Sequence, residues 1–409
     1  MQKVTLLFTF ILFLTSSASA SVLDNRRTRQ LKNDLEVART AVRKAVNLVE
    51  DNDESRKRIK ALQDSERTLN AYFKDSLFRN RKDLRLISLD ILKKQYDVYN
   101  DRLYLNMPID TMAMVLKGKQ YLVSMLSFDS LEVGKSYRKK HSEMLAPYHG
   151  NLLKGGIYCM AHEKWKEAWD CLDLYLDSRR QPLFSNIKFN SANDEFAAFL
   201  ALMCGKSLDS LSLMMKYSEE AINYSPRREY TLQLLAEAWK LFTPQKMYLH
   251  YLKEGFKFYP QSSYFFPRLI DYYTSHGKAD EAMLYINKAL EMDPRNQLFL
   301  LAKHSVLMSQ KNYDEALKYG VTLLRDNPDQ AIPNYNVGYI YYLRALDAQK
   351  RYERSYRQRQ KDAQEEYSKC LPYIERYRKL MPNDRERWYP ILYEVYLNLN
   401  MGKKFDSLL

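Results

Sequence analysis

Glycine, proline, cysteine and histidine are scarce in this sequence of 409 residues. Only 11 glycines and 13 prolines occur, against 33 tyrosines. So few residues that break regular backbone, together with abundant Leu, Ala, Glu, Lys and Arg, favour helix over sheet. No segment after the first twenty residues is apolar enough to cross a membrane.

The residue patterns of familiar enzymes are also missing. His162-Glu163 begins like a zinc-protease helix, but Lys166 stands where the second histidine would be needed. The run ending at Ser207 resembles the end of a phosphate-binding loop, but Leu200 takes the place of its first glycine. With no nucleophile elbow and no dinucleotide motif either, we expect no catalysis, no metal site and no cofactor.

The 4 cysteines, Cys159, Cys171, Cys204 and Cys370, leave two possibilities open. An exported protein can form disulfides, and Cys159 and Cys171 fall in the two helices of one predicted helix pair. Antiparallel packing would place Cys159 nearer to other positions than to Cys171, and a bridge needs Cα atoms within about 7 Å. Buried free thiols are the alternative.

The chain begins with the features of an export signal. Lys3 is followed by a short apolar run, Val4–Leu14, and then by small residues that include Ala18 and Ala20. The run is shorter than the roughly 20 residues of a spanning helix, which disfavours a retained membrane anchor. We expect cleavage after Ala20 and export, with a bacterial periplasm as the expected location.

A net charge of +14 indicates acidic partners: an acidic protein face, an anionic glycan or lipid, or nucleic acid. An export signal argues against nucleic acid. The chain is also longer than one compact core usually holds, a limit that a solenoid avoids because each unit contacts only its neighbours.

Prolines mark a repeat. Pro226, Pro260, Pro294 and Pro328 are each 34 residues apart, and Ala282 and Ala316 share that spacing. This is the period of the tetratricopeptide repeat (TPR), in which each unit is a pair of antiparallel helices. An unrelated helical bundle with chance spacing is the alternative. We expect an all-α fold, a TPR-type right-handed superhelical solenoid of antiparallel helix pairs.

Small residues recur at three places in the unit when its closing proline is numbered 32. Position 8 holds Gly156, Ala236 and Gly338; position 20 holds Ala168, Ala282 and Ala316; position 27 holds Ala221, Gly255 and Ala289. Small side chains there let helix backbones approach, while proline at position 32 ends the second helix. Gly277 falls in the turn between two helices.

The frame predicts the domain organisation. After the signal peptide at 1–20, residues 21–148 should form divergent helical hairpins with apolar stripes along 31–49 and 84–98. Residues 149–409 should form the TPR array. Its unit starting near 331 closes at Pro382, 54 residues after Pro328, and so carries a 20-residue helical insertion. A capping helix should end the array.

Six stretches resemble a largely uncharacterised family of exported TPR proteins from Bacteroidetes bacteria. They are Lys74–Asn80, Asp110–Ala113, Tyr137–His141, Asn151–Gly156, Tyr264–Tyr273 and Asn398–Lys403. The resemblance covers nearly all of the chain after the signal. It implies the TPR fold and export, and it supplies no catalytic residue.

Function should therefore reside on surfaces, and the concave face is the first candidate. TPR geometry turns positions 2, 5, 9, 12 and 13 inward, and tyrosine offers broad contact area with few torsions to freeze. Packing between helices is the other interpretation of these tyrosines. We expect a non-enzymatic scaffold that binds a protein or peptide through Tyr230, Glu237, Lys240, Tyr264, Asp271, Tyr339, Tyr342, Tyr389, Tyr393 and Tyr396.

The predicted insertion is the second candidate surface. Residues 344–361 hold seven basic and two acidic side chains, with no proline or glycine. An ordinary solvated helix face explains such a run equally simply. The alternative function is an anion-binding module that contacts an anionic glycan, lipid or nucleic acid through Lys350, Arg351, Arg354, Arg357 and Arg359.

Overall fold

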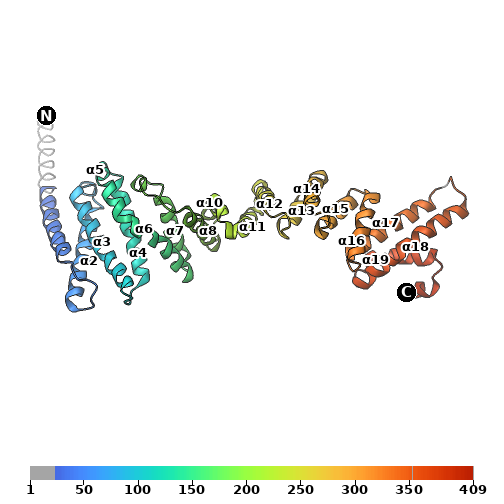
Figure 1. Ribbon diagram of the computed structural model, residues 1–409, viewed down its shortest axis with the longest axis horizontal. Helices are drawn as coiled ribbons and strands as arrows, with labels where there is room; N and C mark the ends of the chain where they lie inside the picture. Colours follow the sequence, from blue (N-terminus) through green and yellow to red (C-terminus); the bar gives the residue numbers. More distant parts are fainter. Residues whose placement is uncertain (1–23, 352, 409) are drawn as a thin grey trace, which may run out of the picture. The chain divides into compact units, whose positions relative to one another are not determined.

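The computed structural model describes residues 24–351 and 353–408. The expected signal peptide and its cleavage point lie outside this part of the chain. Every regular element within it is a helix (Figure 1). None of these helices combines the length and the apolar character needed to cross a bilayer.

The helices fall into two compact units, Met1–Thr231 and Leu232–Leu409. In the first unit residues 24–44 are helical. They are followed by α2 (Asp53–Tyr72), α3 (Lys82–Tyr104), α4 (Thr111–Asp129), α5 (Glu132–Lys135), α6 (Arg138–Ala161), α7 (Trp165–Ser178), the 3₁₀ turn η1 (Pro182–Phe184), α8 (Ser191–Ser207), α9 (Leu211–Met215), α10 (Ser218–Asn223) and the 3₁₀ turn η2 (Ser225–Arg227).

One face of the first helix packs against α2 and α3. Its buried side chains include Leu31, Leu35 and Ala38, and the stripe expected along α3, such as Leu84 and Ile91, is buried in the same cluster. The first stripe ends earlier than the sequence suggested. The helix stops at residue 44, Asn47 adopts a left-handed backbone with φ 54°, and Val46 is consequently exposed.

The expected change from divergent hairpins to TPR array at 148/149 falls inside a helix. Helix α6 runs from Arg138 to Ala161 with Pro147 within it. A proline there removes one backbone hydrogen bond and disturbs one turn, and the packed neighbours of α6 stabilise the rest of the helix. Pro147 therefore does not separate two elements, and the helix that holds Gly156 begins before residue 149.

The second unit continues the helix pairs. Helix α11 (Arg228–Trp239) contains the boundary, and it is followed by α12 (Lys246–Phe258), α13 (Phe265–Ser275), α14 (Ala279–Met292), α15 (Gln297–Ser309), α16 (Tyr313–Asp326), α17 (Ala331–Gln349), α18 (Tyr356–Leu380), α19 (Arg385–Asn398) and α20 (Gly402–Asp406). From α12 onward, successive helices pack on each other. The fold is an all-α solenoid of TPR type, as the sequence predicted.

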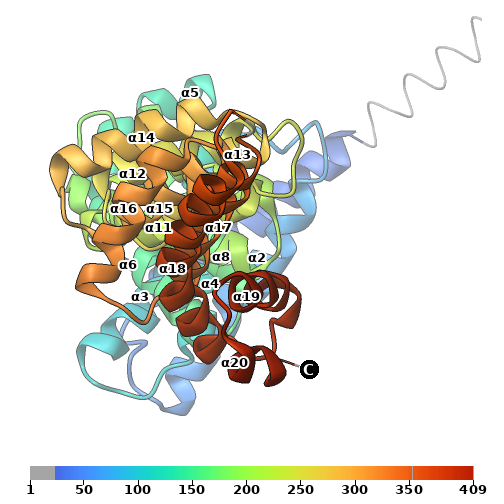
Figure 2. The ribbon, with the colours of Figure 1, turned by 90° about the vertical axis from the view of Figure 1, so that its right-hand side faces the viewer.

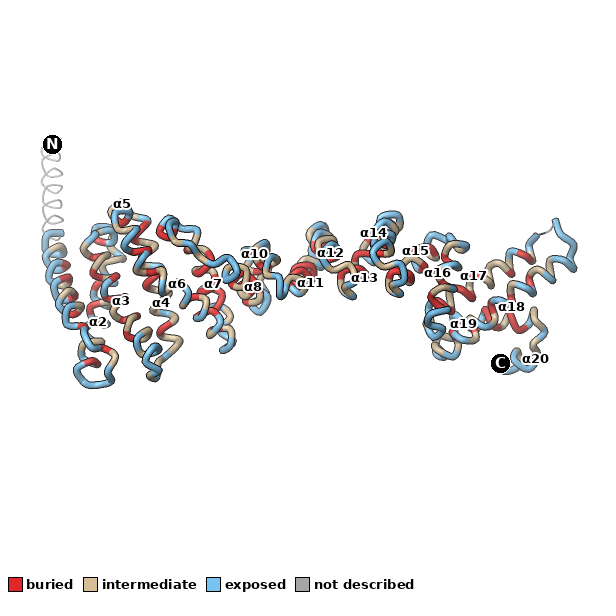
Figure 3. The backbone as a smooth tube through the Cα atoms, viewed as in Figure 1, coloured by how far each residue is buried: buried red, intermediate tan, exposed pale blue. Residues whose placement is uncertain are grey.

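The small residues lie where the repeat frame requires close packing. Ala168, Ala282 and Ala316 are fully buried, and Figure 3 shows buried residues recurring along the helices. At Gly255 an added Cβ would lie 2.2 Å from the Phe265 ring, so only glycine fits. Gly277, with φ +69°, makes the turn between α13 and α14.

The unit with the expected insertion is built from two long helices. Helix α17 has 19 residues and α18 has 25, whereas α13 to α16 have 11 to 14. The two long helices lie side by side in Figure 2 and pack along their length. Residues 344–361 form the end of α17, the connecting loop and the start of α18.

Candidate functional site

A groove lies between α13 and α15, the first helices of two consecutive repeats. It encloses about 330 Å³. Its lining comes only from these two helices: Phe266, Pro267, Ile270, Asp271, Thr274, Leu298, Leu301, Ala302, Ser305, Val306 and Ser309. We call it the α13–α15 groove.

The floor of the α13–α15 groove is apolar and its edge is polar. Phe266 and Val306 are buried, whereas Asp271 and Ser305 are exposed. The hydroxyls of Thr274 on α13 and Ser309 on α15 hydrogen-bond to carbonyls of their own helices. The Asp271 carboxylate and the Ser305 hydroxyl have no bonded partner among the described residues. They are therefore available to a ligand lying over an apolar floor.

Three side chains form a connected cluster at the start of α13. The Tyr264 hydroxyl donates to Glu237 Oε1 at 2.6 Å, and Arg268 Nε lies 3.7 Å from the same oxygen. The Arg268 guanidinium also lies over the Tyr264 ring, 3.9 Å from its centre. Burial and the carboxylate of Glu237 raise the pKa of Tyr264. Lys240 lies 3.9 Å from Glu237, so this part of the prediction describes one assembled polar surface.

Tyrosines on α17 and α19 form two short ladders. Tyr339 stacks on Tyr335 at 5.8 Å and lies 6.3 Å from Tyr342. On α19, Tyr389 and Tyr393 are 6.3 Å apart. All of these rings are half-buried against the core of the long helix pair. Each ring thus has one face for packing and part of its surface in solvent, so both interpretations of these tyrosines hold in part.

Tyr396 does not belong to the groove surface. It is only 2% exposed, and its hydroxyl donates to Glu375 at 2.9 Å. Together with Val395, it lies in the core between α18 and α19. The prediction of Tyr396 as a partner-binding residue is wrong, because a ring enclosed by its own helices has no surface to offer.

Tyr230 lies on α11, the helix that also holds Glu237. Its hydroxyl accepts a hydrogen bond from Lys206 Nζ at 3.3 Å, and the same ammonium lies 5.7 Å from its ring centre. The ring is 38% exposed. It remains a candidate contact residue.

The basic residues around the loop after α17 have acidic neighbours. Arg351 forms an ion pair with Asp347 at 2.7 Å, and Arg354 forms one with Asp362 at 2.5 Å. Arg359 donates to the carbonyl of Gln349 at 3.3 Å. Asp362 lies one residue beyond the window whose charges were counted, so the sequence overstated the free charge. Lys350 and Arg357 are exposed.

Sequence reasoning missed several residues of the α13–α15 groove. Pro267, Leu301 and Ser305 occupy positions 5, 5 and 9 of their repeats, the same inward positions from which other residues were chosen. Aliphatic and small polar side chains are common on every helix face, so their residue type does not indicate a binding surface as clustered tyrosines do. Arg268, which contacts both Tyr264 and Glu237, was also missed. Its place in the repeat is not one of the positions expected to face inward.

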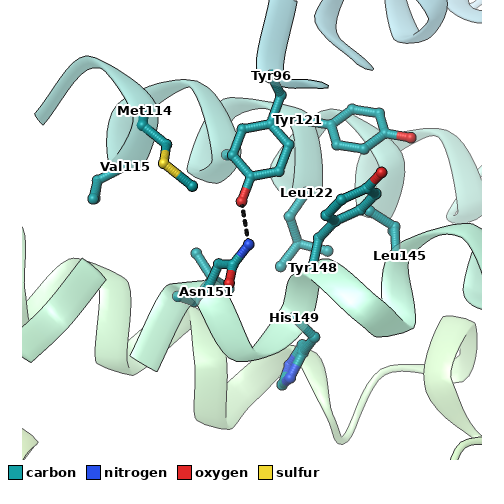
Figure 4. Close-up of a pocket in the computed structure, with 11 residues that line it drawn as sticks. Tyr96, Met114, Val115, Tyr121, Leu122, Leu145, Tyr148, His149 and Asn151 are labelled. Carbon is teal, nitrogen blue, oxygen red and sulfur yellow. Dashed lines mark hydrogen bonds between the residues drawn. The ribbon is translucent and has the colours of Figure 1, made fainter. Parts of the chain in front are cut away.

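A small cavity in the first unit is lined by three tyrosines (Figure 4). Asn151 donates to the Tyr96 hydroxyl at 2.8 Å, and the buried Tyr121 hydroxyl has no protein partner in the described structure. Its volume of 30 Å³ suits one or two water molecules, since a water needs roughly 10–15 Å³. The cavity is too small for an organic ligand.

No group of three or more His, Cys, Asp or Glu side chains within the described residues could hold a metal ion. All four cysteines are buried free thiols, and burial raises the pKa of Cys171 to about 12. The structure thus contains the free-thiol alternative rather than a bridge.

The solved structures that are similar to this chain include TPR proteins. No family model and no curated protein matches the sequence. Among solved structures the chain is similar to YrrB, a TPR protein with an unusual peptide-binding site, at 13% identity and TM-score 0.32, over 52% of this chain and 92% of that one. It is also similar to a thermophilic TPR protein of Thermus thermophilus, at 16% identity and TM-score 0.20, over 60% and 98%.

A third similar structure is the APC/C hetero-tetramer Cut9–Hcn1, at 13% identity and TM-score 0.31, over 84% of this chain and 59% of that one. Such low values carry no argument about function. The fold class follows from the helix pairs themselves.

Proposed function

We propose that the chain is a non-enzymatic scaffold that binds a peptide segment of a partner protein in the α13–α15 groove. The observation that supports this most is the combination of an apolar floor with unpaired polar groups at the edge, inside one groove of about 330 Å³. An apolar anchor residue would fill the floor, while Ser305 is placed to hydrogen-bond the peptide backbone.

The charge of the groove indicates which peptides would bind. Asp271 lines the groove and has no ion-pair partner among the described residues, so its carboxylate favours a lysine or arginine next to the apolar anchor. Tyr264 and Arg268 would extend the contact along the same face. The export signal expected at the N-terminus supports an exported location, where the partner would also be found.

A random peptide library, selected on the immobilised chain, tests this proposal. We expect enrichment of peptides with an aliphatic or aromatic residue close to a basic one. Ser305→Trp places a large ring in the groove and should abolish capture of the enriched peptides. Val321→Trp is the matched control, because Val321 is exposed on α16 and does not line the groove. Equal capture by both variants would refute the proposal.

Anion binding by the loop after α17 is a weaker alternative. It rests on Lys350 and Arg357, since Arg351 and Arg354 are paired with Asp347 and Asp362. Exposed charges are screened beyond about 8 Å at physiological salt, so such binding should fall steeply as salt is raised. Peptide binding in an apolar groove should depend on salt much less.

A further inference from the structure

A second cleft lies between α2, α3 and α4 in the first unit. It encloses about 220 Å³ and is separate from the cavity lined by the three tyrosines. Its lining mixes polar and apolar residues: Glu66, Asn70, Phe73, Arg85, Ser88, Leu89, Ile91, Leu92, Gln120, Val123, Ser124 and Ser127. We call it the Arg85 cleft.

Arg85 is held in a fixed position in this cleft. Its Nε donates to the carbonyl of Arg79 at 2.6 Å, and its Nη1 donates to Ser127 Oγ at 3.1 Å. The guanidinium also lies 4.8 Å from the centre of the Phe73 ring. Of its five N–H groups, three have no partner among the described residues. A planar group held from three sides, with its remaining donors free, is prepared for a ligand.

The charge of Arg85 is not compensated by the protein. No carboxylate of the described chain lies within ion-pair distance of it. Glu66 is the acidic residue of the cleft, and its charge is already paired. Lys117 Nζ donates to both of its carboxylate oxygens at 3.1 Å, and Gln120 Nε2 donates to Oε1 at 2.7 Å. Burial is the main reason why the pKa of Arg85 is lowered. One positive charge therefore remains in a partly desolvated site, where charges are ordinarily paired.

Hydroxyl groups complete the polar lining. Ser88 Oγ is buried and has no hydrogen-bond partner in the described structure. Ser127 accepts from Arg85 and keeps its own proton to donate. A single uncompensated charge matches a monoanion, whereas a phosphate dianion would call for further cations. We propose that the Arg85 cleft binds a small molecule through a carboxylate group, which pairs with Arg85 and accepts from Ser88 or Ser127.

A peptide C-terminus and a sugar acid both carry such a carboxylate, and the experiment compares these two sources. Isothermal titration calorimetry on the full chain would compare N-acetyl-alanyl-alanine with its C-terminal amide, and glucuronate with methyl glucoside. We expect a dissociation constant of ~1 mM or tighter for at least one acid and at least tenfold weaker binding of its neutral counterpart. The acid that binds identifies the source.

Variants then assign the binding to the cleft. Arg85→Lys keeps the charge but loses the planar fork and should weaken binding about tenfold, and Arg85→Gln should abolish it. Arg67→Gln is the matched control, because the Arg67 side chain is 83% exposed on α2 and does not line the cleft. Circular dichroism would check that each variant is folded.

If Arg85→Gln does not fold, the wild-type chain and Arg85→Lys still decide the matter. The proposal is overturned if neither acid binds the wild-type chain at ~10 mM, well above the affinity expected for a built site. It is equally overturned if acid and neutral counterpart bind alike, or if a folded Arg85→Gln or Arg85→Lys variant binds as tightly as wild type.

Discussion

The hydroxyl of Tyr264 donates a 2.6 Å hydrogen bond to Glu237 Oε1, which joins the residue before α13 to the end of α11. Both side chains were candidates for binding from sequence position alone, and the structure shows that they bind each other. The pair therefore contributes to the packing of two consecutive repeats.

Removing the hydrogen bond between Tyr264 and Glu237 should lower the free energy of unfolding by a small but measurable amount. Tyr264→Phe keeps the ring and deletes the hydroxyl, so we expect the free energy of unfolding to fall by about 1 kcal/mol because the site is partly exposed. Tyr272→Phe on the same helix is the control. Urea unfolding curves that coincide for wild type and Tyr264→Phe would show that the bond contributes nothing.

Glycine at position 27 of a repeat should be sensitive to one methyl group. Gly255→Ala places a Cβ 2.2 Å from the Phe265 ring and should destabilise by about 1–3 kcal/mol through overpacking. Gly150→Ala, within α6, meets nothing within 4 Å and should stabilise by up to about 1 kcal/mol through helix propensity. Thermal denaturation of the two variants should shift in opposite directions, and a shared direction would contradict this account of the packing.

Buried His149 should make the chain less stable in mild acid. Burial and Arg179 lower its pKa from 6.5 to about 4, so the folded state holds the neutral imidazole. Its stabilising contribution is complete above pH 6.5 and is lost as the pH falls toward 4, by up to about 3 kcal/mol. Denaturant unfolding at pH 7 and pH 5 should show a smaller difference for His149→Gln than for wild type. His250→Gln, at an exposed histidine, should behave like wild type.

The tyrosine ladders should matter for binding more than for folding. Replacing Tyr339, Tyr342 and Tyr393 by Ala should weaken binding of those library peptides that extend beyond the α13–α15 groove to α17 and α19, since aromatic contacts often cost about 2 kcal/mol each when truncated. Tyr396→Ala should instead lower the unfolding free energy by about 3 kcal/mol or more, because that ring is buried. If the triple variant binds peptides like wild type, the ladders lie outside the binding surface.

The repeat was readable from sequence because proline and small residues obey hard steric limits. The closing prolines of the repeats, such as Pro294 and Pro328, follow the ends of α14 and α16, and Ala282 or Ala316 cannot be enlarged without separating two backbones. Pro147 suggested a break between two helices near residue 148. The structure has none there, because the packing of α6 against its neighbours outweighs the one backbone hydrogen bond that Pro147 removes. The expected solenoid is therefore confirmed, and the position 148/149 lies within α6.

The candidate site was harder to predict from the sequence, because whether a side chain faces the core or the solvent depends on how its helix packs against its neighbours. Tyr396 and Tyr393 are three residues apart on one helix, yet one is buried and the other half-exposed. Ser305 lines a groove only because α13 and α15 leave space at that point. The neutralisation of Arg354 by Asp362 spans eight residues and depends on the loop that brings them together.

Hydrogen–deuterium exchange of the chain with and without a library-selected peptide tests the central claim most directly. If the α13–α15 groove is the binding site, the peptide should slow exchange at amides of α13 and α15, and this protection should disappear in Ser305→Trp but remain in Val321→Trp. Protection confined to the first unit, or to the loop between α17 and α18, would contradict the proposed function.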